Sequence, residues 1–165
     1  MKNIFNWQIK QVNNSIFVLM NKTSVGRLLL SDYSLTAHAE LFDKAYQFKR
    51  KHLFSVATEV TMQDDLNPIV LIRQNIWTSG SKIKLGNSIY LFKYKNLFCR
   101  EWNIFDNNGK SIIDSKRTNN NSEIVYEEEN HVLFLCGLYL SGNDFIESSN
   151  ITWVLLIVIL YCTIF

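Results

Sequence analysis

The chain has 165 residues, of which 47% are hydrophobic and 19% are charged, with a single proline. This much apolar surface offsets the entropy cost of ordering the chain, so an intrinsically disordered protein is excluded and one domain with a sizeable core is expected. The 17 basic and 15 acidic residues leave a net charge of +2. That balance gives no reason to expect a nucleic-acid partner, and we expect none.

The N-terminal stretch MKNIFNWQIKQVNN has polar residues in every apolar run. It lacks the roughly 7 to 15 consecutive apolar residues of a secretory signal peptide, so a cytoplasmic protein is predicted. Cysteine usage agrees, because Cys99, Cys136 and Cys162 are odd in number, have no CxxC spacing and stand in apolar surroundings. We expect buried free thiols and no disulfide.

The middle of the chain contains two similar stretches, YQFKRKHLF from Tyr46 and YLFKYKNLF from Tyr90, identical at six of nine positions. The residues before them also align without a gap, AHAELFDKAYQF with SKIKLGNSIYLF. Each copy has the pattern of a strand, a two-residue turn and a second strand, with the turns at Phe42-Asp43 and Gly86-Asn87. Glycine and asparagine tolerate the positive φ of such turns. The repeat therefore predicts two equivalent β-hairpins.

Aromatic residues alternate with polar ones in both copies, which is typical of strands with one buried face. We expect four of them to be buried at equivalent positions: Tyr46, Phe48, Tyr90 and Phe92. The repeat period of about 42 to 44 residues also suits a propeller blade, but a propeller needs at least four blades and this chain has room for about three. A single closed or nearly closed antiparallel β-barrel over residues 1–126 fits better, because closure removes exposed sheet edges.

Two unbroken apolar segments follow, Val132–Leu140 and Ile151–Phe165, in a region of residues 127–165 assigned to the same domain. Neither alternates, so each is buried on all sides, in protein or in lipid. Asn130 and Asn150 suit helix N-caps, although a buried strand is an alternative for the second segment. As a helix the second segment spans roughly 22 Å, short of a bilayer, so we expect it in the barrel core, with a membrane tail as the alternative.

The repeated strand–turn–strand units, their Y-x-F-K-x-K-x-L-F texture and the wholly apolar C-terminal segment resemble the tubby C-terminal-like superfamily. That superfamily includes the LURP-one-related proteins and the phospholipid scramblases. The resemblance implies a β-barrel of about twelve strands around a hydrophobic C-terminal helix, and our strand count between Ile4 and Tyr126 is compatible with it. One departure is that two apolar segments compete for the central position.

Tubby domains bind phosphoinositide head groups through surface Lys and Arg, and scramblases associate with membranes. The resemblance therefore implies an anionic lipid or membrane surface as a partner. The candidate lipid-binding residues are Lys49, Arg50, Lys51, Lys93, Lys95 and Arg100. The alternative is that these cations are solvated outward faces of strands that prevent edge pairing.

No catalytic motif is present in the sequence. The chain has no glycine-rich phosphate loop, GxSxG or HExxH, so we expect no enzyme activity and no cofactor. His38 and Glu40 share a strand face but have no third ligand, so we expect no metal site. We therefore expect a non-enzymatic barrel that binds a lipid, a membrane surface or a protein. The alternatives are a tail-anchored membrane protein that displays a cytoplasmic barrel, and an enzyme whose site no motif reveals.

Overall fold

The computed structural model of the chain describes residues 2–12, 15–20, 26–31, 34–52, 55–63, 65, 67–75, 80–95, 101–117, 122–127 and 131–143. The strands within these residues are β1 (Lys2–Val12), β2 (Ser15–Met20), β3 (Gly26–Ser31), β4 (Thr36–Leu41), β5 (Lys44–Arg50), β6 (Ala57–Met62), β7 (Val70–Gln74), β8 (Gly80–Leu85), β9 (Ser88–Tyr94), β10 (Trp102–Phe105), β11 (Ser111–Arg117) and β12 (Ser122–Glu127). All neighbouring pairs are antiparallel, which confirms the predicted mainly β fold.

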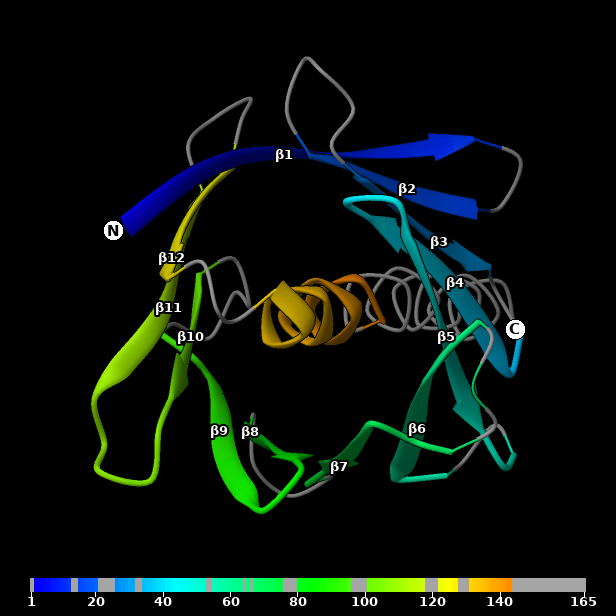
Figure 1. Cartoon of the computed structure of the whole chain (residues 1–165). Coiled ribbons are helices and arrows are strands. Elements are labelled where there is room, and N and C mark those ends of the chain that lie inside the picture. Colours follow the sequence, from blue (N-terminus) through cyan, green and yellow to red (C-terminus); the bar gives the residue numbers. More distant parts are fainter. Residues whose placement is uncertain are drawn as a thin grey trace, which may run out of the picture.

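The strands pair in chain order, and the order of pairing is circular. β1 pairs with β2 on one side, where Trp7 is opposite Met20, and with β12 on the other, where Lys2 is opposite Glu127. The strands therefore form a barrel, and Figure 1 looks along it. Because side chains alternate along a strand, each hairpin has one apolar face, and this face points into the barrel.

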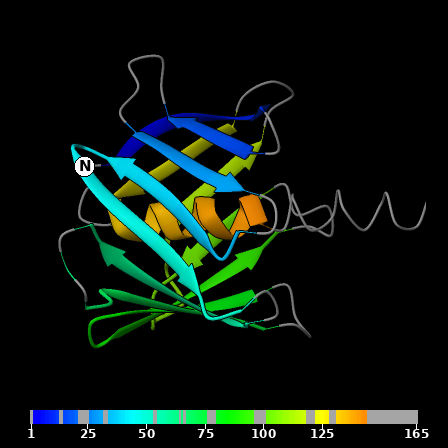
Figure 2. The same ribbon diagram turned by 90° about the vertical axis from the view of Figure 1, so that its right-hand side faces the viewer.

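A helix described over residues 131–143 lies inside this barrel and runs lengthwise through it (Figure 2). Every residue of the helix from Leu133 onward is buried, as expected for a helix that is apolar on all sides. Rings of the helix stack on rings of the barrel wall, Tyr139 on Phe48 at 4.5 Å and Phe134 on Tyr126 at 5.1 Å between centroids. The helix supplies much of the core.

The predicted segment Val132–Leu140 falls within this helix, and burial is confirmed for all of it except the half-buried Val132. The other apolar segment, Ile151–Phe165, lies outside the described residues, as do the predicted caps Asn130 and Asn150. The described residues thus place one of the two competing segments in the centre of the barrel.

The sequence repeat corresponds to the β4–β5 and β8–β9 hairpins. The first turn has two consecutive positive φ angles, 48° at Phe42 and 60° at Asp43, and the second has Gly86 at 57°. These values confirm the predicted two-residue turns.

Three of the four predicted core aromatic residues are confirmed, with Tyr46 5% exposed, Phe48 0% and Phe92 1%. The prediction for Tyr90 is wrong, because this residue is only half-buried. The pairing of β9 with β10 runs from Leu91 to Tyr94, so Tyr90 lies just beyond it and lacks a neighbour on that side.

Candidate functional site

The basic residues predicted to form one lipid-binding surface lie in different surroundings. Lys49 is on the outer face of β5, opposite Glu59 of β6, and Lys51 is exposed just after β5. Arg50 instead lies on the inner face, where its Nε donates a hydrogen bond to the Tyr139 hydroxyl at 3.0 Å. The Arg50 guanidinium also lies over the Tyr139 ring, 5.9 Å from its centroid. Arg50 therefore joins the barrel wall to the central helix.

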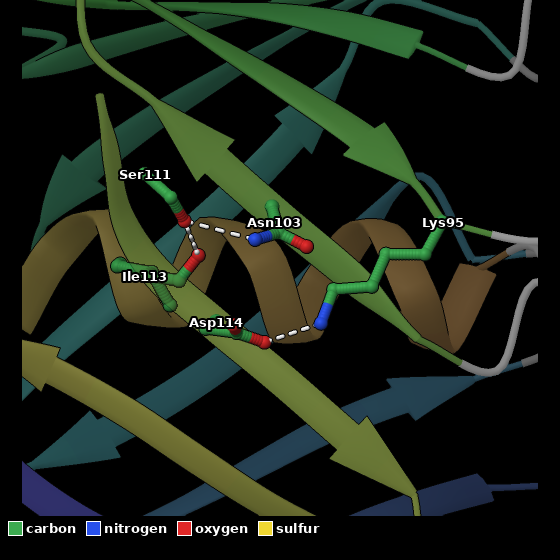
Figure 3. Close-up of polar contacts among 5 residues, drawn as sticks. All are labelled: Lys95, Asn103, Ser111, Ile113 and Asp114. Carbon is green, nitrogen blue, oxygen red and sulfur yellow. Dashed lines mark hydrogen bonds and ion pairs between the residues drawn. The ribbon is translucent and has the colours of Figure 1, made fainter. Parts of the chain in front are cut away.

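Lys95, at the end of β9, forms an ion pair with Asp114 of β11 (Figure 3). A second polar contact lies nearby, where Asn103 Nδ2 donates to Ser111 Oγ at 2.8 Å and Ser111 Oγ donates to the Ile113 carbonyl at 3.2 Å. Lys95 is thus partly neutralised by a partner on the wall. Arg100 lies outside the described residues, so Lys93 is the remaining member of the predicted set.

Lys93 lines a groove of about 650 Å³ at one end of strands β7, β8 and β9, hereafter the β7–β9 groove. Its lining residues are Val56, Arg73, Gln74, Asn75, Gly80, Ser81, Lys82, Leu91, Lys93 and Tyr94. Strand register brings three exposed cations together here. Arg73 is directly opposite Lys82 across β7 and β8, and Lys93 is opposite Gly80 across β8 and β9.

The chemistry of the β7–β9 groove favours an anion. None of its described lining residues is a carboxylate, so nothing within that lining neutralises the three cations. Like charges held side by side at a concave surface raise the local positive potential and attract anionic ligands. Leu91 and the 44% exposed Val56 add apolar surface beside the charges. The groove therefore suits a ligand that has both a negative group and an apolar part.

A second groove, of about 600 Å³, crosses β4, β5 and β6 on the outer face. Its charged lining residues have both signs, Glu40, Lys49, Glu59 and Asp65, and His38 lies among them. Arg27 holds Glu40 through two hydrogen bonds of 2.8 and 2.7 Å, and the bond lowers the pKa of that carboxyl. Within the described residues, no cluster of three metal-ligating side chains includes His38 and Glu40. Its carboxylates outnumber its one lysine, so this groove does not favour an anion.

The described cysteine, Cys136, is buried in the central helix, and burial raises the pKa of its thiol. A protonated buried thiol is a poor nucleophile, so Cys136 serves packing. Cys99 and Cys162 lie outside the described residues.

The prediction from sequence missed Arg73 and Lys82. The signal that identifies them is alternation, because VLIRQ and GSKIK each place a cation on the face opposite to the buried Ile72 and Ile83. Alternation does not give the register between strands, and register is what places Arg73 beside Lys82.

Comparisons with known proteins add little to this geometry. No family model matches the chain, and no curated protein matches it. An X-ray structure of a protein from Arabidopsis thaliana is similar, with a TM-score of 0.42 and 11% sequence identity, over 89% of this chain and 91% of that chain. A likeness this remote assigns neither family nor function. Within the described part of the chain, no helix combines the length and apolar character needed to cross a bilayer.

Proposed function

We propose that the protein is a non-catalytic β-barrel module that binds anionic phospholipid headgroups at a membrane surface through the β7–β9 groove. The architecture proposed with it is a closed, tubby-like barrel around a hydrophobic C-terminal helix. The observation that supports the proposal best is the convergence of Arg73, Lys82 and Lys93 on a groove whose described lining has no carboxylate.

The ligand class follows from the side chains. Arg presents a planar fork of donors to phosphate oxygens, while Lys acts as a compact point charge. A phospholipid offers a phosphate to these groups and an apolar part to Leu91 and Val56, whereas a free phosphate ion uses only the cations. Each basic side chain near an anionic membrane surface contributes about 1 kcal/mol of binding.

The lack of an evident reaction centre in the groove supports a binding role. Its described lining has no histidine, cysteine or carboxylate to act as a general base or nucleophile. We therefore propose recognition of a headgroup without chemistry on it.

Vesicle co-sedimentation tests the proposal. The full chain is mixed with vesicles of phosphatidylcholine alone and of phosphatidylcholine with phosphatidylserine, with and without added inorganic phosphate. The expected result is sedimentation with the anionic vesicles, little with the neutral ones, and weak competition by inorganic phosphate. Equal sedimentation with both kinds of vesicle would refute the headgroup role, and complete competition by inorganic phosphate would assign the groove to a free anion.

A second candidate function is a tail-anchored membrane protein whose barrel is displayed at the cytoplasmic face. The position of the helix of residues 131–143 favours it. Because this helix already occupies the barrel centre, the core does not require Ile151–Phe165. Carbonate washing of membranes from cells that express the full chain tests it. Retention in the membrane pellet would support an anchor, and complete release would exclude one.

A further inference from the structure

The two ends of the barrel differ in charge. At one end lie residues 34–35, 51–52 and 55–56, Asn75, Lys95 and Glu101, which belong to the connections of β3–β4, β5–β6, β7–β8 and β9–β10. At the other end lie the turns at residues 42–43, 86–87 and 106–110. We name the first end the basic pole and the second the hairpin pole. Figure 2 shows both ends of the barrel from the side.

At the basic pole, strands β5, β7, β9 and β11 each end in or beside cations. These residues are Arg50, Lys51, Arg73, Lys93, Lys95 and Lys116. Some face carboxylates: Lys95 pairs with Asp114, and Lys116 is opposite Glu123 in the register of β11 and β12. The three cations of the β7–β9 groove, Arg73, Lys82 and Lys93, face no carboxylate within the groove lining. Lys51 is exposed at the same pole.

At the hairpin pole, the described charges are mixed. Asp43 is followed directly by Lys44, and Asp106 lies in the same turn as Lys110. The Asp106 carboxylate accepts hydrogen bonds from the backbone N–H groups of Asn108 and Lys110, so it also stabilises the turn. Exposed apolar side chains occur at both poles, Leu35 at the basic one and Ile89 near the hairpin one. Charge therefore distinguishes the two poles and apolar surface does not.

The central helix runs from the hairpin pole to the basic pole. His131, at its beginning, lies against Phe42 of the β4–β5 turn, with 4.6 Å between ring centroids. Near its other end Tyr139 contacts Arg50 at the end of β5, and Gly142 lies against Leu30 near the end of β3. The last described residue of the helix, Asn143, therefore lies at the basic pole.

We propose that the basic pole is the membrane-facing end of the protein, so that the barrel stands end-on to an anionic phospholipid surface. This orientation rests on the proposed lipid binding by the β7–β9 groove and extends the contact to the β3–β4 and β5–β6 connections. Charge complementarity selects the pole, because negative headgroups attract the end with unneutralised cations.

A fluorophore sensitive to polarity, attached at single cysteines of the full chain, tests the orientation. Cys99→Ser and Cys162→Ser remove two native thiols, and the buried Cys136 is retained. Leu35→Cys reports on the basic pole outside the groove, Val56→Cys on the groove, and Asn87→Cys on the hairpin pole; all three positions are exposed. Circular dichroism melts first confirm that each variant folds.

With vesicles that contain phosphatidylserine, the expected result is a blue shift and quenching by spin-labelled lipid at positions 35 and 56, with neither change at position 87. A change at position 56 without one at position 35 would mean side-on binding and overturn the orientation while leaving the proposed function intact. A change at position 87 as large as that at position 35 would also overturn it. Absence of vesicle binding by the full chain would overturn both.

Discussion

The substitution Gly137→Ala tests how closely the central helix fits the barrel wall. A methyl group at residue 137 would lie 2.4 Å from Cη2 and 2.5 Å from Cζ3 of Trp102. Carbon atoms in contact lie about 3.5 to 4.0 Å apart, so either the indole or the helix must move by about 1 Å. Trp102 is 0% exposed and lies beside Phe92, with 5.5 Å between the ring centroids, so its ring has little room to shift.

Two opposing effects set the magnitude. Replacing a helical glycine by alanine ordinarily stabilises a helix by about 1 kcal/mol. Overpacking a filled core costs about 1 to 3 kcal/mol, and the cost is at the upper end where a rigid ring must yield. We therefore expect Gly137→Ala to lower the free energy of unfolding by about 1 to 2 kcal/mol, measured by urea unfolding followed by far-ultraviolet circular dichroism.

A double-mutant cycle with Trp102→Phe supplies the control. The smaller ring removes the outer indole atoms that the methyl group meets, so Gly137→Ala should be neutral or stabilising in that background. If Gly137→Ala stabilises the chain that retains Trp102, the helix does not pack against β10 as described. An equal effect in both backgrounds would assign the loss to something other than Trp102.

Three further predictions concern the core. Phe92→Ala, which removes a ring that is 1% exposed, should lower the unfolding free energy by about 3 to 5 kcal/mol; a loss below about 1 kcal/mol would place this side chain outside the core. Burial raises the pKa of the Cys136 thiol, so the unfolded thiol ionises first and stability should fall as pH rises above 9.0, the ordinary value. The same pH titration of Cys136→Ala should lack this component, and an identical slope in both proteins would contradict it. Because the helix of residues 131–143 fills the barrel centre, a chain of residues 1–150 should unfold cooperatively on heating, and a broad non-cooperative melt would show that Ile151–Phe165 also belongs to the core.

The local features of the fold follow from short-range sequence pattern. The turn at Gly86 and the inward faces of Phe48 and Phe92 are predictable because alternation and turn chemistry act within a few residues. The half-burial of Tyr90 is not, because it depends on where β10 begins to pair with β9. The ion pair of Lys95 with Asp114 likewise joins the residue after β9 to a residue of β11, with β10 between the two strands.

The sequence also did not determine which of the two apolar segments forms the centre of the barrel. Val132–Leu140 and Ile151–Phe165 are similarly apolar, so burial alone does not rank them. A finer signal exists in the two glycines of the described helix, because Gly137 and Gly142 permit close approach of the barrel wall. Ile151–Phe165 contains no glycine, but reading this difference requires knowledge of the wall residues that the glycines meet.

For the β7–β9 groove, the sequence predicted the type of residue but not which residues come together. Exposed Lys and Arg on outward strand faces were expected, and Lys93 is one of them. The association of Lys93 with Arg73 and Lys82 depends on the register of three strands. This register cannot be predicted from a single sequence. The inward orientation of Arg50 depends on Tyr139, which is 89 residues away in sequence.

The measurement that tests the central claim most directly compares two triple variants that lose the same charge. Arg73→Gln/Lys82→Gln/Lys93→Gln alters the β7–β9 groove, while Lys44→Gln/Lys84→Gln/Lys110→Gln alters exposed positions away from it. At about 1 kcal/mol for each cation, the groove variant should bind vesicles that contain phosphatidylserine about 100-fold more weakly than the unaltered chain. The control variant should change the affinity by less than about threefold, because only the diffuse field is altered. Equal losses in the two variants would contradict a specific groove and leave general electrostatic attraction as the explanation.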